Sequence, residues 1–164
     1  MPATPLTEEQ AWSVLRAVPD PEIPVISITE LGIVRDIRTS QDAVTVVVTP
    51  TYSGCPATEV IAASICDALE AAGAGKVHVE TQLSPPWTTD WLAPEAAEKL
   101  RTYGIAAPGT RVTTQTLRFV PPAPKCPRCG EKATIRVSEF GSTACKAFYR
   151  CPSCLEPFEY FKPI

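Results

Sequence analysis

The spacing of apolar residues predicts a helix followed by a β-hairpin at the start of the chain. Thr7 and Gln10 have the spacing of a capping box and precede apolar residues at helical intervals, which predicts a helix over 8–18. Two apolar, β-branched runs follow, one around residues 33–37 and one over 44–49, and a polar turn separates them. This pattern is typical of an antiparallel hairpin.

Helical spacing returns after Pro56 and predicts a second helix over 56–72. Its expected buried stripe consists of Val60, Ile61, Ile65, Ala68 and Leu69. Apolar and polar residues then alternate over 77–81, which predicts a third strand. A strand, a helix and a strand in this order form a right-handed crossover with parallel strands. Together with the hairpin, the crossover predicts a mixed sheet and an α+β fold.

The second half of the chain predicts further elements and a domain boundary. A third helix is expected over 94–103 and a further strand over 111–119. The proline-rich segment 121–125 is typical of a stiff, extended linker. We therefore expect a first domain over 1–120 and a small second domain over 126–164.

The composition is typical of a globular protein, and the sequence shows neither the pattern of a signal peptide nor that of a transmembrane helix. The chain has 164 residues, 45% of them hydrophobic, and a mean hydropathy of +0.02. The N-terminus lacks the basic and apolar regions of a signal peptide, and no apolar run approaches the length of about 18 residues typical of a transmembrane helix. We expect a cytoplasmic protein with no membrane partner.

Charge is divided unevenly along the chain. Residues 1–124 carry 8 Lys+Arg against 14 Asp+Glu, and residues 125–164 carry 7 against 4, so the two parts have net charges of −6 and +3. An excess of three cations is too small to indicate a nucleic-acid partner, for which a pronounced basic stripe is expected. It would suit docking onto an acidic protein.

Cys55 occupies a short turn between the second predicted strand and the second predicted helix. Because Pro56 suits the first helical position, we expect Cys55 at the N-cap, where free backbone N–H groups and the helix dipole favour the thiolate. The carboxyl end of a parallel strand is also where α/β sheets usually bind ligands. The alternative is a small buried residue that closes a strand–helix corner.

Two C-x-x-C pairs in the last forty residues have the spacing of a metal site. Cys126 and Cys129 form the first pair, and Cys151 and Cys154 form the second. Each pair makes a tight turn that presents two thiolates, and two such turns supply the four ligands of a tetrahedral structural zinc. A segment this short has too little core to fold securely without such a staple. We expect zinc here; iron–sulfur and redox-active dithiols are the alternatives.

Two further features carry a functional and a structural interpretation. Cys145 lies near the tip of the predicted ribbon hairpin, beside Lys146. It is either an additional reactive thiol or a small buried residue. It is too far along the strand from Cys151 to ligate the same metal.

Asp20 and Glu22 lie in a loop that prolines hold out of helical conformation. Asp20 suits a turn cap as well as a functional role there.

The chain resembles the iron–sulfur cluster assembly (FSCA-like) domain family, which includes the SufT-type factors. The resemblance rests on four motifs and the C-terminal cysteines: Asp20–Pro24, Glu30–Val34, Thr51–Pro56, Trp87–Trp91, and Cys126, Cys129, Cys151 and Cys154. With the C-terminal zinc ribbon included, it is most similar to the branch of this family associated with the ring-epoxidising phenylacetyl-CoA oxygenase.

This resemblance implies a non-catalytic accessory factor that helps assemble or insert an iron–sulfur or di-iron centre. It implies that Cys55 is the reactive transfer thiol and that Asp20, Glu22 and Thr51 support it. The expected cofactors are a structural zinc and a transient iron or iron–sulfur cluster. The expected partner is an oxygenase or reductase component, and a homodimer is possible. The alternative is a thiol-based redox enzyme that uses Cys55 or the C-x-x-C pairs.

Overall fold

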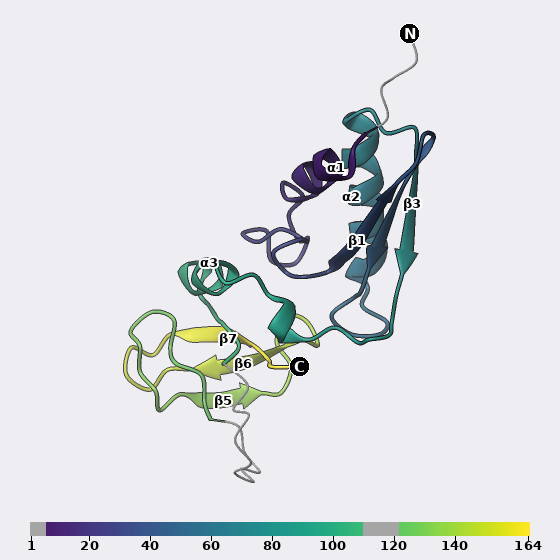
Figure 1. The fold of residues 1–164 in the computed structure, drawn as a ribbon. Coiled ribbons are helices and arrows are strands. Elements are labelled where there is room, and N and C mark those ends of the chain that lie inside the picture. The colour runs from purple at the N-terminus through teal and green to yellow at the C-terminus, as the bar shows by residue number, and fades with distance from the viewer. Residues whose placement is uncertain (1–5, 110–121) are drawn as a thin grey trace. The chain divides into compact units, whose positions relative to one another are not determined.

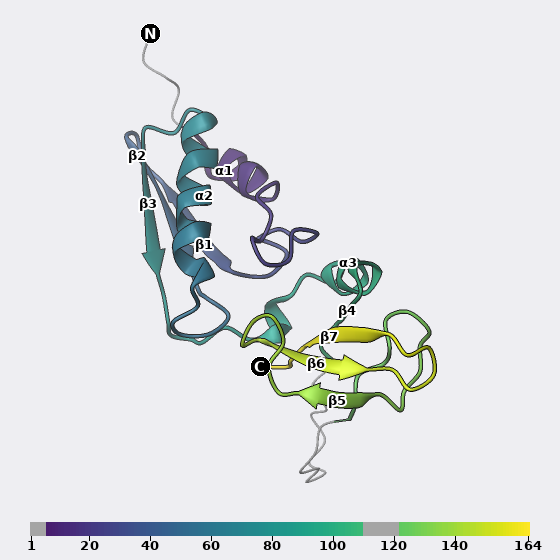
Figure 2. The same cartoon turned by 180° about the vertical axis from the view of Figure 1, so that it is seen from behind.

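The computed structural model describes residues 6–109 and 122–164, and it divides the chain into two compact units, Met1–Ala93 and Pro94–Ile164. Each unit has its own sheet (Figures 1 and 2). The second unit begins before the boundary expected at 121–125, because the third helix and a short strand after it belong with the C-terminal sheet. The strand expected over 111–119 lies outside the described residues.

The first unit is a three-stranded mixed sheet with two helices. Its elements are α1 (Glu8–Leu15), β1 (Val34–Thr39), β2 (Ala43–Val48), α2 (Ala57–Ala71) and β3 (Lys76–Thr81). The strand order is β1-β2-β3, with β1 antiparallel and β3 parallel to β2. Figure 2 shows α2 lying across one face of this sheet, with α1 beside it. The predicted hairpin and crossover are both confirmed.

Helix α1 begins where the sequence predicts and ends earlier. The Thr7 side chain accepts from the Gln10 backbone N–H, and the Gln10 side chain accepts from the Thr7 N–H, which completes the capping box. Ala11 and Leu15 are fully buried. Beyond Leu15 the chain turns, and Val18 is buried outside the helix.

Helix α2 buries a narrower stripe than the sequence predicts. Ile61, Ile65 and Leu69 are buried as expected, and Ala57 joins them at the start of the helix. Val60, expected in the stripe, is 53% exposed. The reason is geometric: residues spaced four apart on an α-helix share one face, and Val60 precedes that series by one residue, which turns it away by about 100°.

The second unit is a four-stranded sheet with one helix. Its elements are α3 (Ala96–Tyr103), β4 (Ile105–Ala106), β5 (Ile135–Ser138), β6 (Lys146–Arg150) and β7 (Pro157–Phe161), and the strand order is β4-β7-β6-β5. A short 3₁₀ helix (Thr89–Trp91) precedes this unit in the chain. β4 pairs in parallel with β7, whereas β5, β6 and β7 form an antiparallel meander.

The core of the second unit includes cysteine. One buried cluster consists of Ala106, Cys126, Cys151, Phe158 and Tyr160, with Tyr149 packed against it. The ring of Tyr149 stacks on Phe158 at a centroid distance of 5.9 Å and meets Tyr160 edge-on at 5.7 Å. A unit as short as Pro94–Ile164 has a limited hydrophobic core, which is the situation in which a bound metal contributes most to folding.

No helix within the described residues is long and apolar enough to cross a membrane.

Candidate functional site

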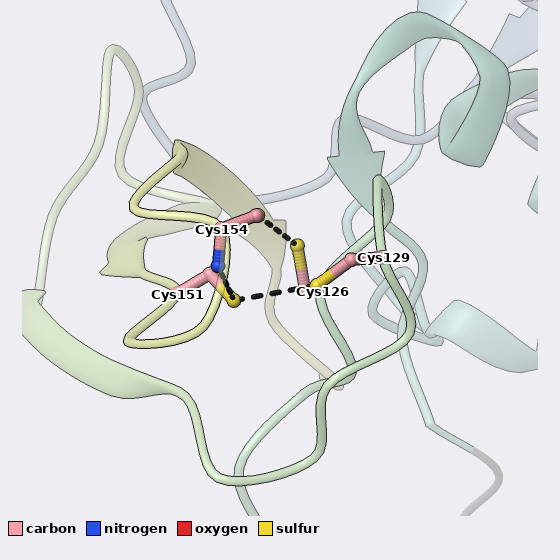
Figure 3. Close-up of side chains that lie close together, drawn as sticks. All are labelled: Cys126, Cys129, Cys151 and Cys154. Atoms are coloured by element: carbon pink, nitrogen blue, oxygen red, sulfur yellow. Dashed lines mark hydrogen bonds between the residues drawn. The ribbon is translucent and has the colours of Figure 1, made fainter.

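The two C-x-x-C turns of the second unit bring four cysteines together, as the sequence predicts. The sulfur atoms of Cys126, Cys129, Cys151 and Cys154 all lie within 4.8 Å of one another. Figure 3 shows the two pairs facing each other across the site. The Cys126 and Cys154 sulfurs are 3.7 Å apart, and those of Cys129 and Cys151 are 3.5 Å apart. Cys126 and Cys151 are buried, whereas Cys129 and Cys154 reach the surface.

The four thiols affect one another's protonation. The Glu131 backbone N–H lowers the pKa of Cys129, but contacts with the other thiols and burial raise it to about 12. Burial raises the pKa of Cys151, but the backbone N–H groups of Cys154 and Ser153 and the neighbouring thiols lower it to about 7. One thiolate therefore forms readily and is shared with the adjacent thiols.

This arrangement fits zinc. Zinc–sulfur bonds of about 2.3 Å in a tetrahedron place the sulfurs about 3.8 Å apart, close to the distances found here. The chain itself supplies all four ligands, as in structural sites, whereas catalytic zinc sites keep one position open. Bound zinc would hold the two turns together and would leave no position for a substrate.

Cys55 lies in the turn between β2 and α2. It is half-buried, its N–H donates to the Tyr52 carbonyl (3.2 Å), and its own carbonyl accepts from the Thr58 N–H (3.1 Å). Helix α2 spans Ala57–Ala71, and Pro56 before it already has helical dihedral angles (φ −65°, ψ −23°), as expected of a proline at the first helical position. Cys55 directly precedes this residue, so it lies within one residue of the N-cap.

The residues expected to support Cys55 are engaged in the local structure. Asp20 is buried, and its Oδ1 accepts from the backbone N–H groups of Glu22 (2.9 Å) and Ile23 (2.8 Å). Asp20 therefore caps its own loop, which was the structural interpretation of this residue. The Glu22 side chain is half-buried, and Thr51 is buried.

Among the described residues, the four-cysteine cluster is the only group of three or more His, Cys, Asp or Glu side chains close enough to share a metal ion. Cys55 belongs to no such group. Cys66, on α2, is half-buried, and burial together with Glu70 and Asp67 raises its pKa. The described parts of this chain therefore offer no set of three or more such ligands for a metal at Cys55.

The tryptophan loop packs against the loop that precedes β1. Trp87 is buried and donates its indole N–H to the Leu31 carbonyl (3.0 Å). The Arg35 guanidinium lies 3.5 Å from the ring centre of Trp91. Trp87 is thus part of the packed structure of the first unit.

Cys145 is buried, 4% exposed, and lies immediately before β6. Its sulfur is 3.1 Å from the Thr143 hydroxyl oxygen. The adjacent Lys146 is paired with Glu159 at 3.0 Å. As expected, Cys145 is not part of the metal-ligand cluster.

Comparison with known proteins also divides the chain into two parts. Residues 8–81 match the family profile described as an iron–sulfur cluster assembly protein, and residues 110–162 match the PaaD zinc beta ribbon domain. A protein of Escherichia coli K12 that is named as a component of 1,2-phenylacetyl-CoA epoxidase is 50% identical over 155 residues, covering 94% of this chain and 92% of the relative. The chain belongs to the PaaD family. The resemblance inferred from its motifs is thereby confirmed.

The first unit also has relatives of its own. An Fe-S protein maturation auxiliary factor of Porphyromonas gingivalis is 34% identical over 96 residues, covering 57% of this chain and 90% of the relative. A DUF59 domain of Bacillus anthracis has a TM-score of 0.53 at 26% identity, covering 57% of this chain and 90% of that one. A conserved hypothetical protein of Thermotoga maritima has a TM-score of 0.51 at 31% identity, covering 59% and 96%. More than half of the PaaD-family chain thus shares its fold with these two solved structures.

Two features near the Cys55 turn are not apparent from the sequence. The Thr49 hydroxyl is buried and has no hydrogen-bond partner in the described structure. Gly32 adopts a φ of +74°, and a Cβ there would lie 2.5 Å from the Trp91 carbonyl oxygen. The Glu30–Val34 motif contains this glycine, but only the contact with Trp91 shows why it is needed.

Proposed function

We propose that this protein is a non-catalytic maturation factor that delivers iron, as an ion or a cluster, to a component of the phenylacetyl-CoA epoxidase. In this proposal Cys55 is the transfer thiol, and Asp20, Glu22 and Thr51 maintain the loops around it. The ribbon is a docking module held in shape by zinc, and the protein acts in the cytoplasm. The names of the relatives support an accessory role, since one is named for an epoxidase and another is a maturation factor.

The observation that carries the proposal is the difference between the two cysteine sites. The ribbon cysteines form a complete four-ligand set, whereas Cys55 is half-buried and has no such set around it among the described residues. A thiolate without a full set of protein ligands is poorly suited to hold a permanent cluster, but it can hold iron temporarily. In the handover, a client ligand replaces the Cys55 sulfur on the iron, no electron is transferred, and Cys55 regains a proton from water.

The test compares Cys55→Ala with Cys66→Ala, since both residues are half-buried cysteines of the first unit. Each variant is coexpressed with the epoxidase components, and the iron content and activity of the purified oxygenase and reductase are measured. We expect Cys55→Ala to abolish loading of one component and Cys66→Ala to leave it normal. Full iron content with Cys55→Ala would refute the transfer role. Catalytic turnover of a disulfide by wild type would support the redox alternative instead.

A further inference from the structure

Three large apolar side chains are exposed in the described part of the first unit, residues 6–93. Val25 is 36% exposed, Val60 is 53% exposed and Leu83 is 59% exposed. A single exposed apolar side chain on a protein surface needs no explanation. Their distribution does need one, because all three lie in segments associated with the same end of the sheet.

Strand pairing places these segments. Val34, where β1 begins, pairs with Val48, where β2 ends, and Val48 pairs with Thr81, where β3 ends. The connections before β1, after β2 and after β3 therefore meet at this end. In Figure 1 the arrowhead of β3 and the β2–α2 connection lie together there.

Each exposed side chain is close in sequence to this end. Leu83 is two residues beyond β3, and the preceding Gln82 N–H donates to the Val48 carbonyl (2.8 Å). Val60 lies in the first turn of α2, directly after the Cys55 turn. Val25 lies in the connection that leads into β1. Val25 and Leu83 thus lie in connections that meet at this end of the sheet, and Val60 lies in the helical turn that follows the Cys55 turn.

The connections at this end are acidic. Residues 19–33, 49–60 and 82–93 contain five carboxylates and no Lys or Arg: Asp20, Glu22, Glu30, Glu59 and Asp90. Glu59 and Asp90 are exposed, Glu22 and Glu30 are half-buried, and Asp20 is buried. Arg16 and Arg35 flank them in sequence. The whole first unit carries 12 Asp+Glu against 4 Lys+Arg, a net charge of −8. A partner that approaches Cys55 meets exposed apolar groups in a negative field, which favours a partner surface of positive charge.

We propose that Val25, Val60 and Leu83, with the acidic connections around them, form the surface on which the client docks to reach Cys55. The client presents an apolar patch bordered by Lys and Arg side chains. This inference rests on the proposed function, because the purpose of the surface is to bring a client ligand to the Cys55 sulfur. A second copy of this chain is the competing occupant, and the binding experiment distinguishes it.

The charge test uses two glutamates on the same helix. Glu59 is exposed in the first turn of α2, at the Cys55 end, and Glu70 is exposed near the last turn, at the opposite end. Glu59→Lys and Glu70→Lys change the net charge by the same amount. We expect Glu59→Lys to weaken client binding about tenfold and Glu70→Lys to change it less than threefold, since charges separated by more than a Debye length of about 8–10 Å are largely screened.

The apolar test uses Val60→Ser with Leu83→Ser, and Tyr103→Ser serves as the control. Tyr103 is 51% exposed in α3, outside the ribbon segment 126–164. Binding is measured by titration calorimetry against the purified metal-free oxygenase component and, separately, the reductase component of the epoxidase, at about 50 and about 300 mM salt. We expect the double variant to bind at least tenfold more weakly and the control to bind as wild type.

Any of four calorimetric results would contradict the proposed docking surface. The first is that wild type binds neither the oxygenase nor the reductase component, and the second is that Glu59→Lys and Glu70→Lys weaken binding equally. The third is that the Val60→Ser and Leu83→Ser double variant binds as tightly as wild type, and the fourth is that wild type binds more tightly at high salt. Sedimentation that shows a wild-type dimer dispersed by Val60→Ser with Leu83→Ser would assign the surface to a second copy.

The same variants separate this inference from the proposed function. The docking variants keep Cys55, so its alkylation rate by iodoacetamide should remain that of wild type while client loading falls. If Cys55→Ala loads the client normally, the transfer role fails irrespective of docking. If Cys55→Ala blocks loading but the docking variants load and bind normally, only the docking surface fails.

Discussion

Replacement of Gly32 by alanine should destabilise the first unit through two separable effects. Gly32 has a φ of +74°, a left-handed conformation that costs an L-residue about 1–2 kcal/mol. An added Cβ would also lie 2.5 Å from the carbonyl oxygen and 2.8 Å from the Cβ of Trp91, so the tryptophan loop must move. Such overpacking costs about 1–3 kcal/mol.

Gly73 provides the matched control. Its φ is +99°, but a Cβ there would meet nothing within 4 Å, so Gly73→Ala introduces backbone strain alone. Alanine also restricts the unfolded chain, which offsets about 0.4–1 kcal/mol in both variants. We expect Gly32→Ala to lower the free energy of unfolding by about 2–4 kcal/mol and Gly73→Ala by about 1 kcal/mol.

Tryptophan fluorescence during urea unfolding measures this difference, because all three tryptophans (Trp12, Trp87 and Trp91) lie in the first unit. Fluorescence therefore reports unfolding of that unit without a contribution from the ribbon. The emission of Trp91 should also shift in Gly32→Ala, since the substitution displaces its backbone. Equal losses of stability in the two variants would refute close packing of Trp91 on Gly32.

Three other perturbations test the remaining structural claims. Cys126→Ser, or removal of metal by a chelator, should unfold the second unit, seen as a loss of its far-UV circular dichroism signal. The urea midpoint of tryptophan fluorescence, which reports the first unit, should stay unchanged; a shifted midpoint would show that the stability of one unit depends on the other. Glu159→Gln should destabilise the second unit by about 1–3 kcal/mol at pH 7, because Lys146, 3% exposed, loses its ion-pair partner. Burial raises the pKa of Glu159, but hydrogen bonds from the Ser142 N–H and Lys146 lower it by more. The pKa of Glu159 in the folded state is therefore below its ordinary value. The stabilisation is therefore present above the unfolded pKa of about 4.3 and is lost as the pH falls through the lower, folded pKa. Thermal melts of wild type and variant should converge as the pH falls below that folded pKa. Thr49→Val should leave the fluorescence-monitored stability unchanged or raise it by about 1 kcal/mol, because the variant removes a buried hydroxyl that has no partner among the described residues; a loss above 1 kcal/mol would reveal a missed hydrogen bond.

Local sequence patterns are sufficient to predict the features that depend on near neighbours. The capping box of Thr7 and Gln10, the hairpin and the crossover each arise from residues close together in the chain, and the structure confirms them. The four metal ligands are also predictable, because each C-x-x-C turn is local and two turns commonly share one metal. These signals need no knowledge of long-range packing.

Features that depend on distant contacts are not predictable in this way. β4 is two residues long and gains its partner β7 from the other end of the second unit, so no local pattern indicates it. This pairing places the third helix with the ribbon and moves the division between units to residue 94. The prediction for Val60 is wrong for a related reason: an apolar residue beside a buried stripe has the same local pattern whether a neighbour covers it or not.

The contrast between the two cysteine sites bears on the proposal that one of them exchanges a metal. A metal held by four chain-supplied thiolates leaves only by breaking several bonds within one folded unit, and the local structure is lost with it. Cys55 belongs to no group of three or more such ligands among the described residues, so in the proposed function incoming client ligands would displace fewer bonds to the chain. Exchange at Cys55 would then leave the fold intact, whereas exchange at the ribbon would not. This difference supports assigning handover to the first unit and a structural role to the ribbon.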